Sequence, residues 1–214
     1  MQTKEYGTGR VINADFFSAN SQVRTGSVDV MITSPPYMNN YHYVRNTRPQ
    51  LYWLDFITSP GEQKPLEIYN FGQYWKTVRE APPIALTFEH PALTQTIEQL
   101  RATRTAHGAY GGPGWANYVA TYFNDCYRFV AALKRVLARQ GVGVVVLGNS
   151  IIQGIDMRTE RVLGEIAAMQ GLSLEGVHCL RTKRVGASIT RSSVRQGERS
   201  KATLGEFAIV MRKR

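Results

Sequence analysis

Short apolar runs alternate with longer amphipathic stretches along the chain, which is the pattern of an α/β fold. Runs rich in β-branched residues predict strands at 10–17, 27–33, 141–150, 172–180 and 204–212. Apolar residues recur at helical spacing and predict helices at 92–103, 116–139 and 158–169. The strands at 172–180 and 204–212 are consecutive, and we expect them to form an antiparallel hairpin.

The stretch 39–115 interrupts this alternation. It is aromatic and punctuated by proline and glycine, and it is far longer than the handful of residues that usually connects a strand to a helix. We interpret it as a functional insertion, used for target recognition, within a single catalytic domain spanning 1–214. Its glycine-rich end, 107–115, predicts a flexible hinge.

Composition narrows the class of protein. The chain has 214 residues, of which 43% are hydrophobic, enough for one domain with a real core. No apolar run approaches the ~18 residues of a membrane span, and the first residues do not resemble a signal peptide, so we expect a cytoplasmic protein. The 2 cysteines and 4 histidines show no ligand-like spacing, and we predict no metal site.

The charge points to a polyanionic partner. The formal net charge is +10 and the pI is about 9.8. The segment 181–201 is rich in cations separated by small polar residues, which predicts a loop that reaches phosphates. A basic loop that is merely solvated is the alternative interpretation. The cations expected to contact DNA from this loop are Arg184, Arg191 and Arg195.

The strand at 27–33 ends in Ser34-Pro35-Pro36-Tyr37. Proline cannot donate to a strand ladder and restricts the residue before it, so the turn is rigid. Open α/β sheets bind their ligands at the carboxyl ends of their strands. The turn therefore predicts a ligand site that presents Ser34 and Tyr37.

The segments TSPPY (33–37), GNS (148–150) and EFAIVMRKR (206–214), each at a predicted strand, resemble the amino-methyltransferases of DNA. The serine before the prolines resembles the cytosine-N4 enzymes in particular. The resemblance implies an α/β, Rossmann-like methyltransferase sheet, S-adenosyl-L-methionine as cofactor, and methyl transfer to the N4 amine of cytosine in double-stranded DNA. An N6-adenine enzyme and a non-catalytic DNA-binding subunit of a modification system are the alternatives.

The resemblance also implies roles for residues. Ser34 Oγ and the Pro35 carbonyl would accept the amino hydrogens of the base, Pro36 would hold the geometry, and Tyr37 would stack on the flipped base. Asp15, Phe16 and Ser34 would contact the cofactor, although a helix N-cap explains Asp15 equally well. Further base-pocket or DNA contacts are expected from Tyr41, Arg45, Arg48, Asn149 and Ser150. The alternative role for Tyr41 is packing in the core of the insertion, and the alternative for residues 149–150 is an ordinary Asx turn.

One part of the family pattern is missing. No glycine-rich DPFxGSG-type segment is present, and the first central strands of the family's sheet have no counterpart. A strand left without a neighbour would be an aggregation hazard. We therefore expect the C-terminal half of a split enzyme, completed by a second chain that carries the glycine-rich motif. A truncated or decayed gene product is the alternative.

Overall fold

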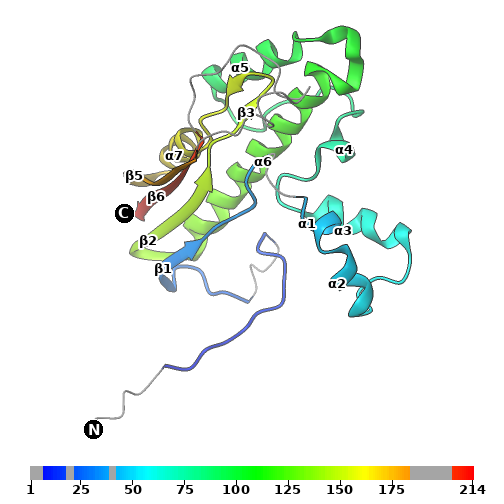
Figure 1. Cartoon of the computed structure of the whole chain (residues 1–214). Coiled ribbons are helices and arrows are strands. Elements are labelled where there is room, and N and C mark those ends of the chain that lie inside the picture. Colours follow the sequence, from blue (N-terminus) through cyan, green and yellow to red (C-terminus); the bar gives the residue numbers. More distant parts are fainter. Residues whose placement is uncertain (1–6, 18–21, 39–41, 184–203) are drawn as a thin grey trace.

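The computed structural model describes residues 7–17, 22–38, 42–183 and 204–214. Its centre is a 4-stranded sheet in the order β1–β2–β6–β5 (Figure 1). The strands are β1 (Val28–Thr33), β2 (Leu137–Gly148), β5 (Leu172–Lys183) and β6 (Leu204–Lys213). Strand β1 is parallel to β2, whereas β6 is antiparallel to both β2 and β5. A small pair, β3 (Ile151–Ile152) and β4 (Ile155–Asp156), follows β2.

Two helices form the core with this sheet. Helix α6 (Gly112–Val136) leads directly into β2, and α7 (Thr159–Met169) lies before β5 and packs on β5, β6 and α6. The side chains of Val145, Ile209 and Met211 are completely buried in this core. Because side chains alternate across a strand, the opposite face carries Val30 and Ile32, which are 59% and 73% exposed.

The insertion between β1 and α6 is helical. Its elements are α1 (Tyr43–Asn46), α2 (Arg48–Trp53), η2 (Pro60–Glu62), α3 (Gln63–Tyr69), α4 (Trp75–Val78), α5 (Pro91–Arg101) and η3 (Thr105–Tyr110). Helices α1 to α3 form a lobe to one side of the sheet, and α5 packs along α6 (Figure 1). Polar side chains of α6 hold the connecting loops: Asn117 Oδ1 accepts from Ile84 N at 2.9 Å and Asn124 Oδ1 accepts from Thr87 N at 2.8 Å.

Two predictions are wrong. Residues 10–17 form no strand. Their aromatic rings pack instead, Phe16 on Phe129 with centroids 5.7 Å apart and Phe17 on Phe71 at 6.1 Å. The glycine-rich end of the insertion is not a hinge, because Gly112 and Gly114 are buried in the first turn of α6. A Cβ on Gly112 would lie 1.9 Å from the carbonyl oxygen of Leu100, so the glycine permits a close approach.

The α/β fold and the β5–β6 hairpin are confirmed. Within the described ranges β1 has β2 as its only neighbour, and its other edge pairs with nothing. None of the helices in those ranges combines the length and hydropathy needed to cross a bilayer.

Candidate active site

The Ser-Pro-Pro-Tyr turn is fixed from two sides. Tyr122 of α6, which is 1% exposed, donates its hydroxyl to the Pro36 carbonyl at 3.0 Å. Ser150, just after β2, donates its hydroxyl to the Met38 carbonyl at 2.5 Å. Burial raises the pKa of the Tyr122 phenol well above its ordinary value, so the hydroxyl remains a donor. The turn is therefore held by its backbone carbonyls, and its side chains are left for other contacts.

Ser34 and Tyr37 lie at the carboxyl end of β1. The exposed Ser34 hydroxyl is 3.4 Å from Tyr37 Oη, a long hydrogen bond. The ring of Tyr37 lies against Gly148, where a Cβ would be 3.1 Å from Tyr37 Cδ2. The glycine of the GNS segment therefore makes room for the tyrosine ring.

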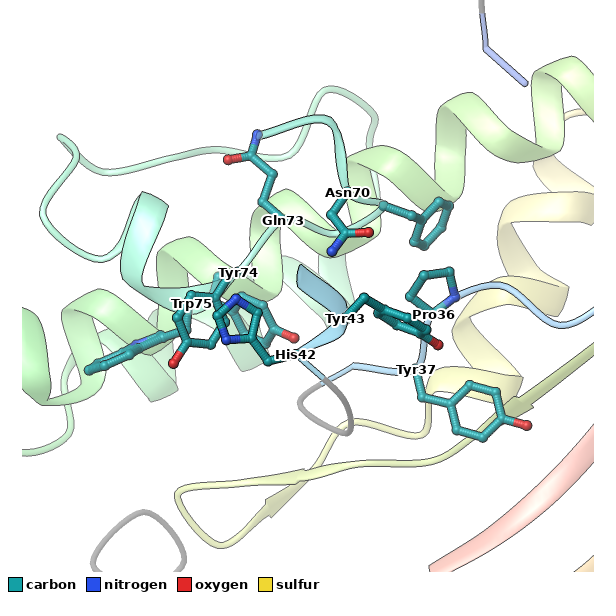
Figure 2. A pocket seen from close by; sticks show the side chains of 10 residues that line it. Pro36, Tyr37, His42, Tyr43, Asn70, Gln73, Tyr74 and Trp75 are labelled. Atoms are coloured by element: carbon teal, nitrogen blue, oxygen red, sulfur yellow. The ribbon is translucent and has the colours of Figure 1, made fainter. Parts of the chain in front are cut away.

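An aromatic pocket of about 170 Å³ opens beside this turn (Figure 2). Its lining residues are Pro36, Tyr37, His42, Tyr43, Asn70, Phe71, Gln73, Tyr74, Trp75 and Tyr118. Figure 2 shows Tyr43 between Pro36 and His42, with the ring of Tyr37 turned away from Tyr74. An apolar cavity of ~150 Å³ holds a benzene molecule, so this pocket has the size of one planar ring.

The loop 70–73 forms one wall of the aromatic pocket and has a constrained backbone. Gly72 and Gln73 have φ of 72° and 50°, in the left-handed region. Gly72 N donates to the buried carboxylate of Asp125 at 2.9 Å, and a Cβ on Gly72 would lie 2.5 Å from the Tyr122 ring. The loop presents the amide of Asn70 at the pocket, whereas Gln73 Oε1 accepts from the Thr77 hydroxyl at 3.2 Å (Figure 2).

A groove of about 860 Å³ adjoins the aromatic pocket and shares His42, Gln73 and Tyr74 with it. We call it the basic groove, because its charged lining is Arg45, Arg48, Lys64, Lys76 and the single carboxylate Glu67.

His42 lies between the aromatic pocket and the basic groove. Its ring stacks on Tyr74 with centroids 3.6 Å apart, and Nε2 is 3.1 Å from Glu67 Oε1. Burial lowers the pKa of His42, against the opposing effect of Glu67, and the nearby Arg45 and Arg48 lower it further. The imidazole is therefore neutral at neutral pH.

The remaining predicted site residues are dispersed. Arg45 and Arg48 line the basic groove. Asn149 Oδ1 accepts from Gly205 N at 2.8 Å, and Ser150 is buried against Met38, so both side chains hold backbone and neither lines the aromatic pocket. A base-pocket role for 149 and 150 stays a prediction.

The predicted cofactor residues are also engaged locally. Asp15 Oδ1 accepts from Phe17 N at 3.2 Å, a contact that an Asx turn and a helix N-cap share, and Phe16 packs on Phe129. Tyr41, Arg184, Arg191 and Arg195 lie outside the described residues. In the part of the chain that the structure describes, no three His, Cys, Asp or Glu side chains gather as a metal site.

Sequence reasoning missed several residues that line the site or hold the turn. Tyr122, Asn70 and Gln73 are distant in sequence from Ser34, and Lys64 and Lys76 belong to short helices without a clear period. The available signal was the glycine of NFGQYW (70–75), because a lone glycine in an aromatic stretch indicates a special backbone conformation.

Comparisons with known proteins add little. No family model matches the chain, and no curated protein matches it. Two solved structures resemble it, both crystal structures of TTHA0409 from Thermus thermophilus, described as "Putative DNA Modification Methylase". The complex with S-adenosyl-L-methionine gives a TM-score of 0.43 at 13% identity, over 93% of this chain and 53% of that one. The selenomethionine derivative gives 0.37 at 11% identity, over 93% and 50%. The chain thus spans about half the length of that protein, and a likeness this low assigns neither activity nor residues.

Proposed function

We propose that the chain is the target-base part of an S-adenosyl-L-methionine-dependent DNA methyltransferase that modifies the N4 amine of cytosine in the cytoplasm. The observation that carries the proposal is the Ser-Pro-Pro-Tyr turn. It sits at the carboxyl end of β1, is fixed by Tyr122 and Ser150, and borders an aromatic pocket the size of one ring. The resemblance of the TSPPY segment to the amino-methyltransferases supports the same interpretation.

The chemistry required of the turn is positioning. The lone pair of an exocyclic amine is delocalised into the ring, so the nitrogen becomes nucleophilic when both its hydrogens are held by acceptors. The exposed Ser34 hydroxyl has one long hydrogen bond, with Tyr37 Oη, and its Oγ has lone pairs that can accept one amino hydrogen. The Pro35 carbonyl accepts the other, and the rigid turn keeps the acceptors in place at low entropic cost.

The aromatic pocket has room for one planar ring. Tyr43 and Tyr74 supply ring surfaces for stacking, which contributes ~1–3 kcal/mol for each base. A base reaches such a site only after leaving the duplex. The choice of cytosine N4 over adenine N6 rests on the serine of the turn, which resembles the cytosine-N4 enzymes.

The described residues fit only part of a cofactor site. S-adenosyl-L-methionine supplies an electrophilic methyl group when bound. Ser34 and the end of β1 suit its reacting end. Asp15, however, is turned onto its own backbone, and no glycine-rich loop follows a strand in the described ranges to hold the methionine half.

We infer that a segment carrying that loop pairs with the open edge of β1, in a second chain as the split-enzyme hypothesis holds. The edge of β1 that no described strand pairs with supports this, and further parts of the same segment would cover Val30 and Ile32 on the exposed face, since burying apolar surface stabilises by ~25 cal/mol per Å². Calorimetry of the isolated chain tests it. We expect no tight S-adenosyl-L-methionine binding by this chain alone, and micromolar binding by a monodisperse monomer would contradict the inference.

The activity is tested with Ser34→Ala and Tyr37→Ala in the assembled enzyme. Methylated DNA is digested to nucleosides and the modified base is identified. We expect N4-methylcytosine from the wild type and a loss of at least ~100-fold in both variants. Ser27→Ala is the matched control, because its hydroxyl donates to Arg24 at the opposite end of β1 and should leave turnover unchanged. N6-methyladenine would overturn the base assignment, and wild-type turnover in both variants would overturn the catalytic one.

A further inference from the structure

The basic groove has a large excess of positive charge. Arg45, Arg48, Lys64 and Lys76 come from four separate helices, α1 to α4, and none forms an ion pair with another described residue. The one carboxylate, Glu67, is already bonded to His42. Four cations gathered around one hollow repel each other, and a polyanion lying among them removes that repulsion.

We propose that the basic groove binds the phosphates of a single DNA strand directly beside the target nucleotide. This rests on the proposed function, since it names where the strand that carries the target runs. The surface is continuous with the base site, because the stacked rings of His42 and Tyr74 line both hollows. A strand held on the cations therefore delivers its next base into the aromatic pocket.

The lining favours a nucleic-acid strand over an acidic peptide. Lysine and arginine side chains are long and reach successive phosphates at the rim, while Tyr74 and Ile68 give the groove surfaces on which sugar and base can lie. Arginine also forms bidentate bonds with phosphate oxygens. An acidic peptide would use the cations but would leave the aromatic pocket next to them without a function.

The proposal has a measurable consequence in salt dependence. Each phosphate contact on single-stranded DNA contributes ~0.7 to the slope of log affinity against log salt. Removing two groove cations should therefore lower the magnitude of the slope by ~1.4, and removing all four by ~2.8. A general loss of positive charge elsewhere on the surface should change it much less.

The test uses fluorescence anisotropy with a dye-labelled single strand of about 12 nucleotides, without cofactor. The variants are Arg45→Gln with Arg48→Gln, Lys64→Gln with Lys76→Gln, and all four together. The matched control is Arg24→Gln with Arg139→Gln, which removes two exposed cations before β1 and at the start of β2, neither of which lines the groove. Circular dichroism checks that each variant is folded.

We expect each groove pair to weaken binding at least ~10-fold and to reduce the slope as calculated, with the control close to wild type. An equal effect of the control pair would overturn the proposal, because net charge alone would then explain binding. Competition by polyglutamate as effective as that by DNA would also overturn it and assign the groove to acidic proteins.

Failure of this proposal is separable from failure of the proposed function. Ser34→Ala should bind the strand with the wild-type salt slope, since its hydroxyl is not among the groove residues. If the salt slope falls in the groove variants but the assembled enzyme yields no methylated base, the groove proposal stands and the methyltransferase proposal fails. If the enzyme methylates DNA but the groove variants keep the wild-type slope, the methyltransferase proposal stands and the groove proposal fails.

Discussion

The hydroxyl of Tyr122 gives the sharpest test of how the catalytic turn is held. Replacing this tyrosine by phenylalanine removes one oxygen atom and keeps the buried ring. The oxygen lies 3.0 Å from the Pro36 carbonyl, which is its acceptor in the turn. Tyr122→Phe therefore frees the turn on the α6 side, while the bond from Ser150 to Met38 remains.

The expected cost follows from burial. Tyr122 is 1% exposed and Pro36 is partly buried, so the carbonyl is left without a full replacement from water. Leaving such a group unsatisfied costs ~1–3 kcal/mol. For a protein of this size each kcal/mol lowers Tm by ~2–4 °C. A misplacement of the acceptors by ~1 Å would reduce catalysis ~100-fold, so we expect methyl transfer to fall by ~10- to 100-fold.

The measurements are thermal unfolding by circular dichroism and single-turnover methyl transfer by the assembled enzyme. The matched control is Tyr127→Phe, the same change in the same helix, where the ring stacks on Phe88 at 4.7 Å and lies outside the aromatic pocket. We expect the control to keep turnover near wild type. A Tyr122→Phe enzyme that loses stability yet turns over like the control would refute the claim that this bond positions the turn.

Three further predictions concern the tyrosine platform, the histidine and the basic loop at 181–201. Gly148→Ala should push the Tyr37 ring aside and lower turnover at least ~10-fold. The control is Gly61→Ala, which should be tolerated because a Cβ there would meet only Ser59 Oγ at 4.0 Å; equal turnover of the two would contradict the packing argument. The pKa of His42 is lower in the folded state than its ordinary value of 6.5, so the stability of the protein should decline as the pH falls below 6.5. His42→Gln should flatten that decline when Tm is measured against pH. An unchanged dependence of Tm on pH in the variant would show that His42 is not responsible. The charged groups facing this imidazole are Glu67, Arg45 and Arg48. Neutralising the predicted phosphate-binding cations of the basic loop should reduce the salt slope for duplex DNA by ~0.9 for each phosphate no longer bound, and an unchanged slope would mean a merely solvated loop. The substitutions are Arg184→Gln, Arg191→Gln and Arg195→Gln.

Local pattern was sufficient for much of the fold. Strand β1 and its proline turn, β2, α7 and the β5–β6 hairpin all lie where apolar periodicity places them, because each buries one continuous face. The run at 10–17 has the same composition as a strand, but a strand also needs a neighbour for its backbone. In the described ranges no neighbour is present, and Phe16 finds its burial against Phe129 instead.

The glycines show a second limit of structure prediction from sequence. Glycine serves both flexible and tightly packed backbone, and sequence does not distinguish the two uses. Gly112 is fixed by the carbonyl of Leu100 and Gly72 by the ring of Tyr122, both contacts between segments far apart in the chain. The candidate site also has one part that sequence predicts and one part that it does not. Ser34 to Tyr37 are contiguous and can be predicted from sequence, whereas the opposite wall of the aromatic pocket comes from 70–75 and Tyr118.

Helix α6 explains why these distant parts form one site. Tyr118 lines the pocket, Tyr122 holds the turn and Asp125 holds the 70–73 loop, at positions i, i+4 and i+7 on one face of the helix. Polar groups on an otherwise buried helix must find partners, and here the partners are the backbone of the turn and of the insertion. The insertion is therefore not an appended module that can be deleted. Removing it would take from the Asp125 carboxylate its bond to Gly72 N, with Arg128 left as its partner, and would take away one wall of the pocket beside Pro36.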